Sequence, residues 1–408
     1  MIPIYQGEAA SEKLTLLTQR NWMGDKPLTS TVETILQSVR TDKDTALKTL
    51  AQQFGDEVPD SFLLRPDEIE KVIDEVSDEI KEVMNEAAEN IRAYAQAVMN
   101  PLQSFELHRH GYVVGMDFKP VERVACYVPG GRYPLPSTAL MTAITAQVAG
   151  VPEICIFSPN IKHEVIYAGT LAGVKRFYNL GGAQAVAAAA FGTESIDAVD
   201  MIVGPGNAYV TEAKRQLQGI VGIDMLAGPS EVAIIADAGA NPEWTALDML
   251  SQAEHDVDAQ AYLFTDSLDF AQAVQKIIGQ QVINDSVILV FETLEDCIAA
   301  SNQLAPEHLE LHVKDPVSIK PKLKHYGALF MGYEASVPFG DYMAGPNHTL
   351  PTAQTARFSG GLSPLTFLRP QSWLSVREGL LYLAEHTEKF AQAEGLTLHA
   401  QAAHSRKT

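Results

Sequence analysis

Hydrophobic residues in the first quarter of the chain recur with the period of an α-helix. Val32, Ile35, Leu36 and Val39 are spaced three and four residues apart, and the acidic stretch from residue 66 to residue 99 repeats this spacing with few glycines. Apolar stripes of this kind are typical of helices that pack one face against a core. The pattern therefore predicts packing helices between residues 30 and 100.

From about residue 121 to residue 335 the pattern changes to short β-rich runs, each followed by a Gly/Pro turn and a helical segment. Strands that alternate with helices predict parallel sheets with crossover helices. One sheet could hold all the strands, but two smaller sheets suit this length better, with the break at Gly228-Pro229-Ser230. The predicted strands are residues 123–128, 153–157, 176–180, 201–203, 232–237, 261–265, 287–291, 310–313 and 328–331.

The expected fold class is α/β, with two Rossmann-like parallel-sheet domains, a helical N-terminal region and a small C-terminal helical extension. Residues 1–122 together with 231–360 are expected to form the first domain, and residues 123–230 the second. The remaining segment, residues 361–408, is polar, helical in pattern and too small for a core of its own. It must therefore pack on the body or on a second subunit.

Composition narrows the class of partner. The 408 residues carry a formal net charge of -21, which argues against nucleic acid and against an anionic membrane surface and favours a small-molecule substrate. Three scattered cysteines indicate no disulfide framework and no CxxC zinc site. The first eight residues lack a basic region and a long apolar core, and no run of 18 apolar residues occurs. We expect a cytoplasmic protein.

Three glycine turns follow apolar runs and precede helices, although the GxGxxG motif of dinucleotide folds is absent. Each turn places helix N-terminal amides where an anion could bind, but each alone is equally a tight connection. Their position at successive strand ends of one sheet favours a nucleotide-sized ligand. The turns are Pro129-Gly130-Gly131, Gly181-Gly182-Ala183-Gln184 and Gly204-Pro205-Gly206-Asn207.

Gln252 and His255 are three residues apart in a predicted helix and project to one face about a turn apart. Imidazole favours Zn²⁺, whereas an amide oxygen is a weak ligand, so a metal here needs two further donors. The best candidates are Asp341 in Phe339-Gly340-Asp341-Tyr342 and a C-terminal histidine. The alternative is a histidine near a helix end beside a solvent-facing glutamine.

Glu307 and His308 lie at the start of a predicted strand, directly after Pro306. In the loop before that strand both side chains can reach one pocket. Histidine is the usual general base for a hydroxyl proton, and a nearby carboxylate can activate water. The alternative is a surface pair, which a neighbouring metal that polarises an alcohol oxygen makes less attractive.

With these motifs in one order, the chain between residues 121 and 399 resembles the histidinol dehydrogenase family. The segments that carry the resemblance are residues 127–131, 135–141, 181–185, 204–210, 227–231, 251–255, 305–309 and 345–352. The family resemblance implies a zinc-dependent, NAD-dependent oxidoreductase that takes L-histidinol through the aldehyde to L-histidine with two hydride transfers.

The resemblance also implies roles for individual residues. His308 is the base of the alcohol step, and Glu307 helps to activate water in the aldehyde step. The implied zinc ligands, which also face the substrate, are Gln252, His255, Asp341 and His399. The implied NAD contacts are Tyr127, Gln184 and Asn207, and the further substrate contacts are Ser230, His348 and Glu394. In this family the C-terminal segment is exchanged within a homodimer, so that Glu394 and His399 would complete the partner's site.

One departure bears on the substrate. The family usually carries Phe-His-x-x-Gln in its N-terminal helices, and the corresponding stretch here is Tyr94-Ala95-Gln96-Ala97-Val98. A paralogue that oxidises another small polar alcohol, such as a sulfonated propanediol, is therefore the alternative to a histidinol enzyme. A non-catalytic relative that binds a nucleotide or a metal is a third class, which the intact Glu307-His308 pair disfavours.

Overall fold

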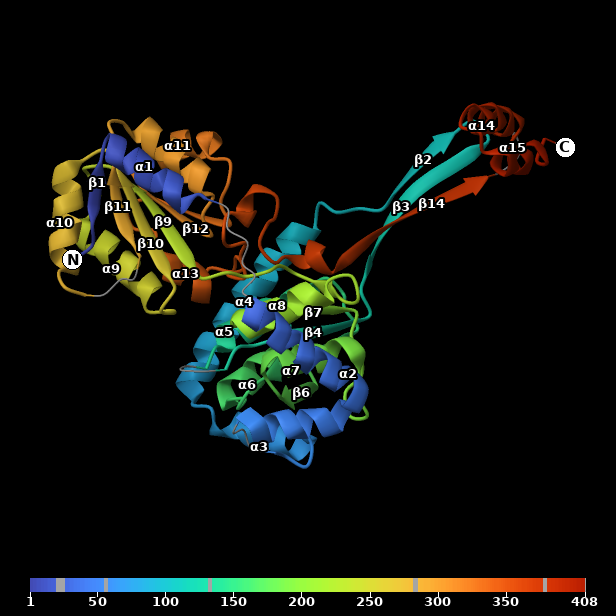
Figure 1. The fold of residues 1–408 in the computed structure, drawn as a ribbon, viewed down its shortest axis with the longest axis horizontal. Coiled ribbons are helices and arrows are strands. Elements are labelled where there is room, and N and C mark those ends of the chain that lie inside the picture. Colours follow the sequence, from blue (N-terminus) through green and yellow to red (C-terminus); the bar gives the residue numbers. More distant parts are fainter. Residues whose placement is uncertain (20–25, 55–57, 131–133, 282–284, 377–379, 408) are drawn as a thin grey trace.

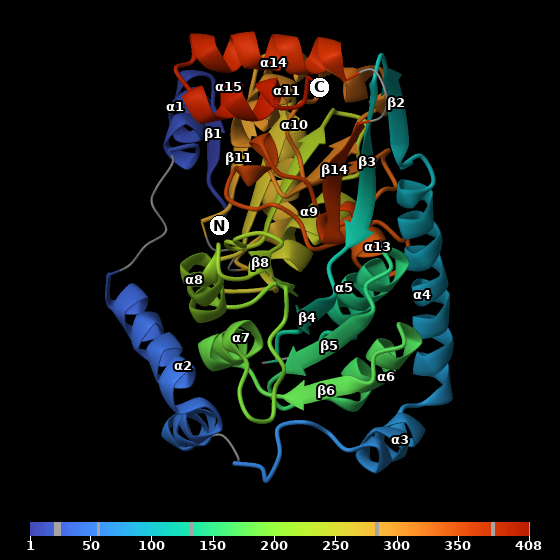
Figure 2. The same cartoon turned by 90° about the vertical axis from the view of Figure 1, so that its right-hand side faces the viewer.

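The computed structural model describes residues 1–19, 26–54, 58–130, 134–281, 285–376 and 380–407. Two lobes, each built on a parallel sheet, lie next to each other, and a long antiparallel arm extends from them (Figures 1 and 2). The N-terminus lies in one lobe and the C-terminus at the tip of the arm. No helix in the described part of the chain is long and apolar enough to cross a membrane.

The first lobe is built on a six-stranded sheet in which all pairs are parallel. In β9, Val232 and Ile234 face one layer of helices, whereas Ala233 and Ile235 face the other. Both faces are covered, as a parallel sheet requires. The strands in spatial order are β1 (Ile4–Gln6), β11 (Val287–Val290), β10 (Gln260–Thr265), β9 (Glu231–Ala236), β12 (His308–His312) and β13 (Ala328–Met331). The helices are α9 (Pro242–Ala253) and α10 (Leu268–Ile278) on one face, and α1 (Glu8–Leu17) and α11 (Leu294–Leu304) on the other.

The second lobe is built on a five-stranded parallel sheet. Its strands in spatial order are β6 (Arg176–Asn179), β5 (Glu153–Ser158), β4 (Arg123–Tyr127), β7 (Met201–Val203) and β8 (Gly222–Ile223). The helices on one face are α3 (Pro66–Glu75), α4 (Asp78–Met99), α5 (Pro136–Val148) and α6 (His163–Leu171), and those on the other are α2 (Lys26–Phe54), α7 (Gly182–Phe191) and α8 (Ala208–Leu217).

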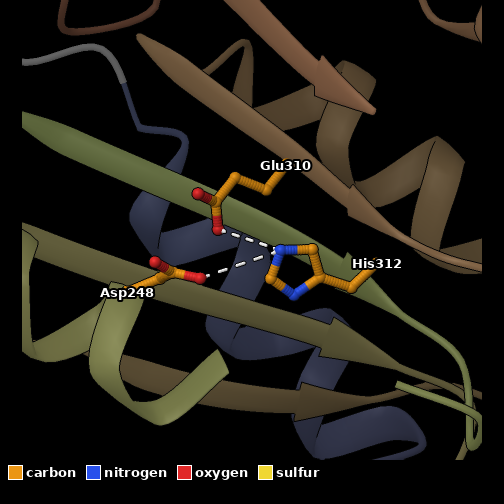
Figure 3. Close-up of side chains that lie close together, drawn as sticks. All are labelled: Asp248, Glu310 and His312. Atoms are coloured by element: carbon orange, nitrogen blue, oxygen red, sulfur yellow. Dashed lines mark ion pairs between the residues drawn. The ribbon is translucent and has the colours of Figure 1, made fainter. Parts of the chain in front are cut away.

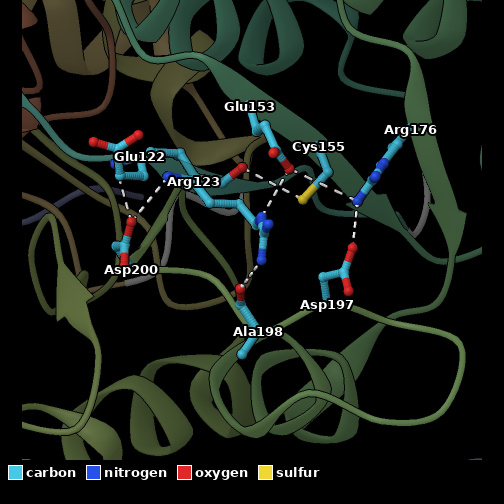
Figure 4. A network of polar contacts seen from close by, with 9 residues as sticks. Glu122, Arg123, Glu153, Cys155, Arg176, Asp197, Ala198 and Asp200 are labelled. Atoms are coloured by element: carbon cyan, nitrogen blue, oxygen red, sulfur yellow. Dashed lines mark hydrogen bonds and ion pairs between the residues drawn. The ribbon is translucent and has the colours of Figure 1, made fainter.

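Polar side chains join the amino ends of this second sheet (Figure 4). The Arg123 guanidinium lies 2.8 Å from the Glu153 carboxylate in the neighbouring strand, and Arg176 lies 2.6 Å from Asp197. The Asp200 carboxylate accepts the backbone N–H groups of Glu122 and Arg123. Arg123, Glu153, Arg176 and Asp197 are thus paired with one another and tie neighbouring strand ends together.

The arm is a three-stranded antiparallel sheet of β2 (Phe105–Arg109), β3 (Tyr112–Pro120) and β14 (Leu368–Val376). The helices α14 (Leu381–Ala393) and α15 (Thr397–His404) pack on each other at its tip (Figure 1). Gly115 of β3 lets the Trp373 ring of β14 lie against the β3 backbone, because a Cβ at this glycine would come within 2.3 Å of that ring. The short elements of the chain are α12 (Pro316–Ile319), α13 (Val337–Tyr342) and the 3₁₀ turns Lys320–Lys322, Thr355–Arg357 and Pro364–Phe367.

All nine predicted strands are present, and they form two parallel sheets with the break after Gly228-Pro229-Ser230, as expected. The prediction of a purely helical C-terminal segment was wrong for Leu368–Val376, where pairing along the whole of β3 provides the backbone hydrogen bonds. The division into domains stays a prediction. Of the residues grouped with the first domain, β1 and α1 pack on the six-stranded sheet, whereas α2, α3 and α4 pack on the five-stranded one.

Candidate active site

The predicted catalytic residues lie at the amino end of β12, next to the amino end of β9 in the six-stranded sheet. His308 is the first residue of β12 and pairs with Val232 in β9, whose first residue is Glu231. Glu307 and His308 were expected at the start of the strand predicted over residues 310–313, and the strand begins two residues earlier, at His308. His308 and Glu307 nevertheless meet, because the Glu307 carboxylate turns back to accept the Glu231 backbone N–H at 2.9 Å.

The His308 imidazole is buried between two carboxylates. Its Nδ1 lies 3.6 Å from Glu307 Oε2 and its Nε2 lies 3.5 Å from Asp341 Oδ1. Burial by itself lowers the pKa of His308, but the charges of Glu307 and Asp341 outweigh burial and raise this pKa to about 9. Its Nε2 is buried and has no hydrogen-bond partner among the described residues. This nitrogen is therefore placed for exchange with a bound molecule.

Asp341 reaches His308 from the short helix α13. Gly340 allows the approach, because a Cβ there would lie 2.6 Å from the Phe330 ring of β13. His348 Nδ1 lies 3.1 Å from the Asp341 carbonyl oxygen, and its Nε2 lies 3.3 Å from the Thr138 hydroxyl of α5. Burial tends to raise the pKa of Asp341, but the neighbouring His308 holds it below the ordinary value. The site thus joins the two lobes, since Thr138 belongs to the other sheet's helices.

Gln252 lies in the last turn of α9, whereas His255 follows the helix, which ends at Ala253, so the prediction of both residues in one helix was wrong for His255. Gln252 is only 2% exposed, and its Nε2 has no hydrogen-bond partner within the described ranges. His255 is exposed, with its Nδ1 3.0 Å from the Ser251 carbonyl oxygen, and its charge helps to lower the pKa of Asp341. The nitrogen and oxygen of an amide are interchangeable by a flip, so an unpartnered buried amide suits a cation held with a carboxylate. These residues fit a metal ion.

A second group of donor atoms is more compact. In the described part of the chain, the ligand atoms of Asp248, Glu310 and His312 all lie within 4.8 Å of one another (Figure 3). Asp248 precedes Gln252 by one turn of α9, and Glu310 and His312 share the face of β12 that carries His308. The sequence prediction missed this group. The signal was present as polar residues alternating with Leu309 and Leu311 along a buried strand.

Glu231 was also missed as a site residue. Its carboxylate accepts the Ala353 N–H at 3.1 Å, and its carbonyl oxygen lies 3.3 Å from His308 Nδ1. Burial and the nearby Glu307 charge raise the pKa of Glu231 to about 8. Ser230, a predicted substrate contact, is half-buried just before β9. Its backbone carbonyl accepts the Gln260 N–H at 3.0 Å.

Glu394 and His399 lie outside this cluster within one chain. Glu394 follows α14 and His399 lies in α15, both exposed at the tip of the arm, away from the lobe that carries His308 (Figure 1). Their predicted roles therefore need a second copy of the chain.

The predicted cofactor residues gather at the carboxyl ends of β4, β6 and β7. The Tyr127 hydroxyl accepts the Gly182 N–H at 3.0 Å, and the Gln184 side chain folds over Gly182, where a Cβ would lie 2.6 Å from its Oε1. Asn207 caps α8 by accepting two backbone N–H groups at 3.1 Å. Gly204 has φ +110 and passes so close to Tyr127 that a Cβ would lie 2.1 Å from its carbonyl oxygen. Glycine turns thus bring Tyr127, Gln184 and Asn207 to one edge of the sheet, although Gly131 lies outside the described residues.

The Gly204 turn is held from behind by a buried ion pair. The Lys214 ammonium contacts Asp224 and donates to the Gly204 carbonyl at 3.0 Å, while Asp224 accepts the Gly204 N–H at 2.7 Å. Both side chains are almost fully buried. Breaking such a pair leaves an uncompensated charge, so this turn is fixed before any ligand arrives.

Comparison with known proteins identifies the family. The family model described as histidinol dehydrogenase matches residues 18–407. The histidinol dehydrogenase of Methanocaldococcus jannaschii is 40% identical over 417 residues, covering 98% of this chain and 97% of the relative. That of Chlorobium chlorochromatii is 41% identical over 421 residues, covering 98% of each. The crystal structure of histidinol dehydrogenase from Elizabethkingia anophelis has a TM-score of 0.93 and 35% identity and covers 99% of this chain and 98% of that chain. The chain belongs to the histidinol dehydrogenase family of NAD- and zinc-dependent oxidoreductases.

Proposed function

We propose that this chain oxidises L-histidinol to L-histidine through the aldehyde, reducing two NAD⁺. The observation that carries the proposal is the buried His308, whose unpartnered Nε2 faces Asp341 while Glu307 lies on the Nδ1 side. A base so placed, only 5% exposed, can take a hydroxyl proton from a bound alcohol. Family membership over nearly the whole chain supports the same substrate.

In this mechanism His308 Nε2 accepts the alcohol proton, while the hydride leaves carbon for NAD⁺. The aldehyde then adds water, and the hydrate loses a second hydride to a second NAD⁺. Glu307 keeps His308 oriented and serves as the carboxylate that helps remove a proton from the attacking water. Zinc held in the proposed site would supply a Lewis acid for the alcohol oxygen and would offset the charge of Asp341, which is one of the causes that raise the pKa of His308.

The zinc ligands proposed are Gln252, His255 and Asp341 from one chain and His399 from a second copy. The unpartnered buried amide of Gln252 and the adjoining Asp341 carboxylate support this set. A catalytic zinc site, unlike a structural one, needs protein ligands together with room for the substrate. Glu394, Ser230 and His348 are proposed substrate contacts around these ligands.

The proposed assembly is a homodimer with exchanged C-terminal segments. The arm carries Glu394 and His399 away from the lobes of their own chain, where both are exposed. This arrangement supports exchange, since within one chain the two residues do not reach His308 and its neighbours. We further propose that residues 1–122 with 231–360, and residues 123–230, form two Rossmann-like units without the GxGxxG motif, and that NAD binds at Tyr127, Gln184 and Asn207. A cytoplasmic location is proposed because Cys126, Cys155 and Cys297 are all free thiols.

The alternative substrate is a sulfonated propanediol. Residues 94–98, where the family motif is missing, lie in α4 beside the loop that follows Asp341, because a Cβ at Gly345 would lie 3.2 Å from Tyr94 Cβ. That proximity makes this stretch relevant to substrate choice.

The deciding experiment measures NADH formation with histidinol, sulfopropanediol and related diols, with and without a chelator. We expect two NADH per histidinol, loss of activity with the chelator and recovery with zinc. Turnover of a diol with none of histidinol would replace the proposed substrate, and unchanged turnover after complete zinc removal would contradict the role of the metal.

A further inference from the structure

The compact group of Asp248, Glu310 and His312 holds three consecutive residues of one segment. His312 Nε2 lies 3.1 Å from the Ala335 carbonyl oxygen. Asp248 accepts the Ser336 hydroxyl at 2.6 Å, and Glu310 accepts the Val337 N–H at 2.7 Å. Each member of the group thus contacts a different residue of the run 335–337.

The run 335–337 leads directly into α13, the helix that carries Asp341. Ser336 is the N-cap residue of α13, yet its side chain makes no capping hydrogen bond to its own helix. Its hydroxyl donates a hydrogen bond to Asp248 instead, and the first N–H of the helix, that of Val337, donates to Glu310. The start of α13 is therefore fixed from outside, by side chains of α9 and β12.

The two elements that supply this group also supply the candidate active site. Asp248 lies one turn before Gln252 on α9, and Glu310 lies two residues after His308 on β12. Consequently one cluster sets the place of α13 relative to both α9 and β12. The positions of Asp341, Gln252 and His308 relative to one another depend on it.

A metal ion held by this group is the competing interpretation. Against it, both ring nitrogens of His312 already have hydrogen-bond partners: Nδ1 lies 3.0 Å from the Thr245 hydroxyl, and Nε2 lies near the Ala335 carbonyl oxygen. A carbonyl accepts only, so Nε2 carries the hydrogen and Nδ1 accepts. Burial raises the pKa of Asp248 to about 6, and burial together with the Asp248 charge raises the pKa of Glu310 well above its ordinary value. Both shifts favour the uncharged carboxyl forms, which bind a cation less well than carboxylates do.

We propose that Asp248, Glu310 and His312 are positioning residues, which place the Asp341 carboxylate against Gln252 and His308 by holding residues 335–337. The inference rests on the proposed zinc site, because the quantity it predicts is the affinity of that site for metal. Partners one layer behind metal ligands commonly alter metal affinity by about 10- to 100-fold.

The test compares variants of the full-length enzyme by chelator competition for zinc and by the absorption spectrum of the cobalt-substituted protein. Ser336→Ala and Glu310→Ala are expected to weaken zinc binding by about tenfold and to shift the cobalt bands. Glu310→Gln is expected to stay within about twofold of the parent, because its amide oxygen still accepts the Val337 N–H. Ser195→Ala and Glu212→Gln are the matched controls, since each removes a hydroxyl-to-carboxylate or carboxylate-to-guanidinium contact outside the site.

Two results would overturn the inference. The first is zinc affinity and cobalt spectra unchanged in Ser336→Ala and Glu310→Ala, with stability losses no different in kind from those of the controls. The second is two metal ions per chain, one of which is lost in Glu310→Gln. If Glu310→Ala does not fold, Ser336→Ala and Glu310→Gln still decide. Failure of the proposed zinc site itself would look different, because Asp341→Asn would then bind zinc as the parent does.

Discussion

The two parallel sheets contribute opposite ends of their strands to the proposed reaction: carboxyl ends in one sheet and amino ends in the other. In the five-stranded sheet the predicted cofactor residues follow the carboxyl ends of the strands, where ligands of open α/β sheets usually bind. In the six-stranded sheet, Glu231 and His308 are the first residues of their strands, so the cluster lies at amino ends. The helix α9 explains the reversal. As a crossover helix it runs back along the sheet, and its last turn brings Gln252 to the amino edge.

The two edges also differ in what they are made of. The five-stranded edge is shaped by backbone, with Gly182 and Gly204 at positive φ and their N–H groups held by Tyr127 and Asp224. The amino ends of the six-stranded sheet carry buried side chains that lack hydrogen-bond partners in the described part of the chain, namely Gln252 and His308, or whose pKa is raised, namely His308 and Glu231. Tyr127, Asp224 and Asn207 are paired within the protein at the five-stranded sheet, whereas at the six-stranded one the Nε2 atoms of Gln252 and His308 have no hydrogen-bond partner among the described residues, which is typical of a reacting centre.

The largest effect is expected for His308→Ala. Removing the base should lower kcat by about a thousandfold or more, while zinc content and NAD affinity stay unchanged, because neither the zinc ligands nor the other sheet are altered. Steady-state NADH formation, metal analysis and NAD titration measure the three quantities. Substantial remaining activity would show that another group removes the proton.

His399→Ala tests the arm. We expect loss of bound zinc and, with it, most activity, while the folded lobes persist, since His399 is exposed and contributes nothing to either core. Zinc content by metal analysis and circular dichroism of the same sample provide the measurement. A variant that keeps one zinc per chain would remove His399 from the ligand set.

Gly204→Ala should affect the cofactor edge alone. The new Cβ would meet the Tyr127 carbonyl, so we expect NAD to bind at least about tenfold more weakly, while zinc affinity stays at the parent value. Gly219→Ala is the matched control, because this glycine also has a positive φ but open space around it. Equal losses in the two variants would mean that backbone strain, and not the contact with Tyr127, is responsible.

The effect of Glu231→Gln is on stability and appears only as pH rises. Because the folded-state pKa of Glu231 is raised to about 8 from an ordinary value of 4.5, the wild type loses stability as pH increases between these values. The glutamine variant lacks this loss, so its relative stability should grow by up to about 1.4 kcal/mol per pH unit and level off above pH 8. Denaturant unfolding across this range measures it. The control is Glu212→Gln. There the Arg215 guanidinium lowers the carboxyl pKa to about 2, so the stability difference between this variant and the wild type changes with pH only below pH 4.5. Parallel stability curves for Glu231→Gln and the wild type would contradict the buried, neutral carboxyl.

The parallel sheets were predictable because each of their strands is a short apolar run closed by a turn, which is a local signal. The arm was not. All residues of β2 are exposed, and β14 forms only by pairing with β3 at the far end of the sequence. Long-range pairing of this kind leaves little trace in local hydrophobicity.

In the candidate site, motifs singled out Glu307, His308, Asp341 and His348, and the structure brings these four residues together, while their roles stay predictions. Its supporting residues were not found, because Asp248 and Glu310 act through contacts with a segment far from both in sequence. Alternation within β12 contained a hint, since polar residues rarely repeat on a buried strand face without a purpose.

The projecting arm has a consequence for mixtures of defective chains. His308 and His399 belong to opposite ends of the molecule, so under exchange each reaction centre draws them from different copies. A chain lacking the first and a chain lacking the second, each inert by itself, would restore one another in mixed pairs, with about one quarter of all centres intact after random reassortment. The geometry of the arm thus predicts complementation between two null alleles of the same gene.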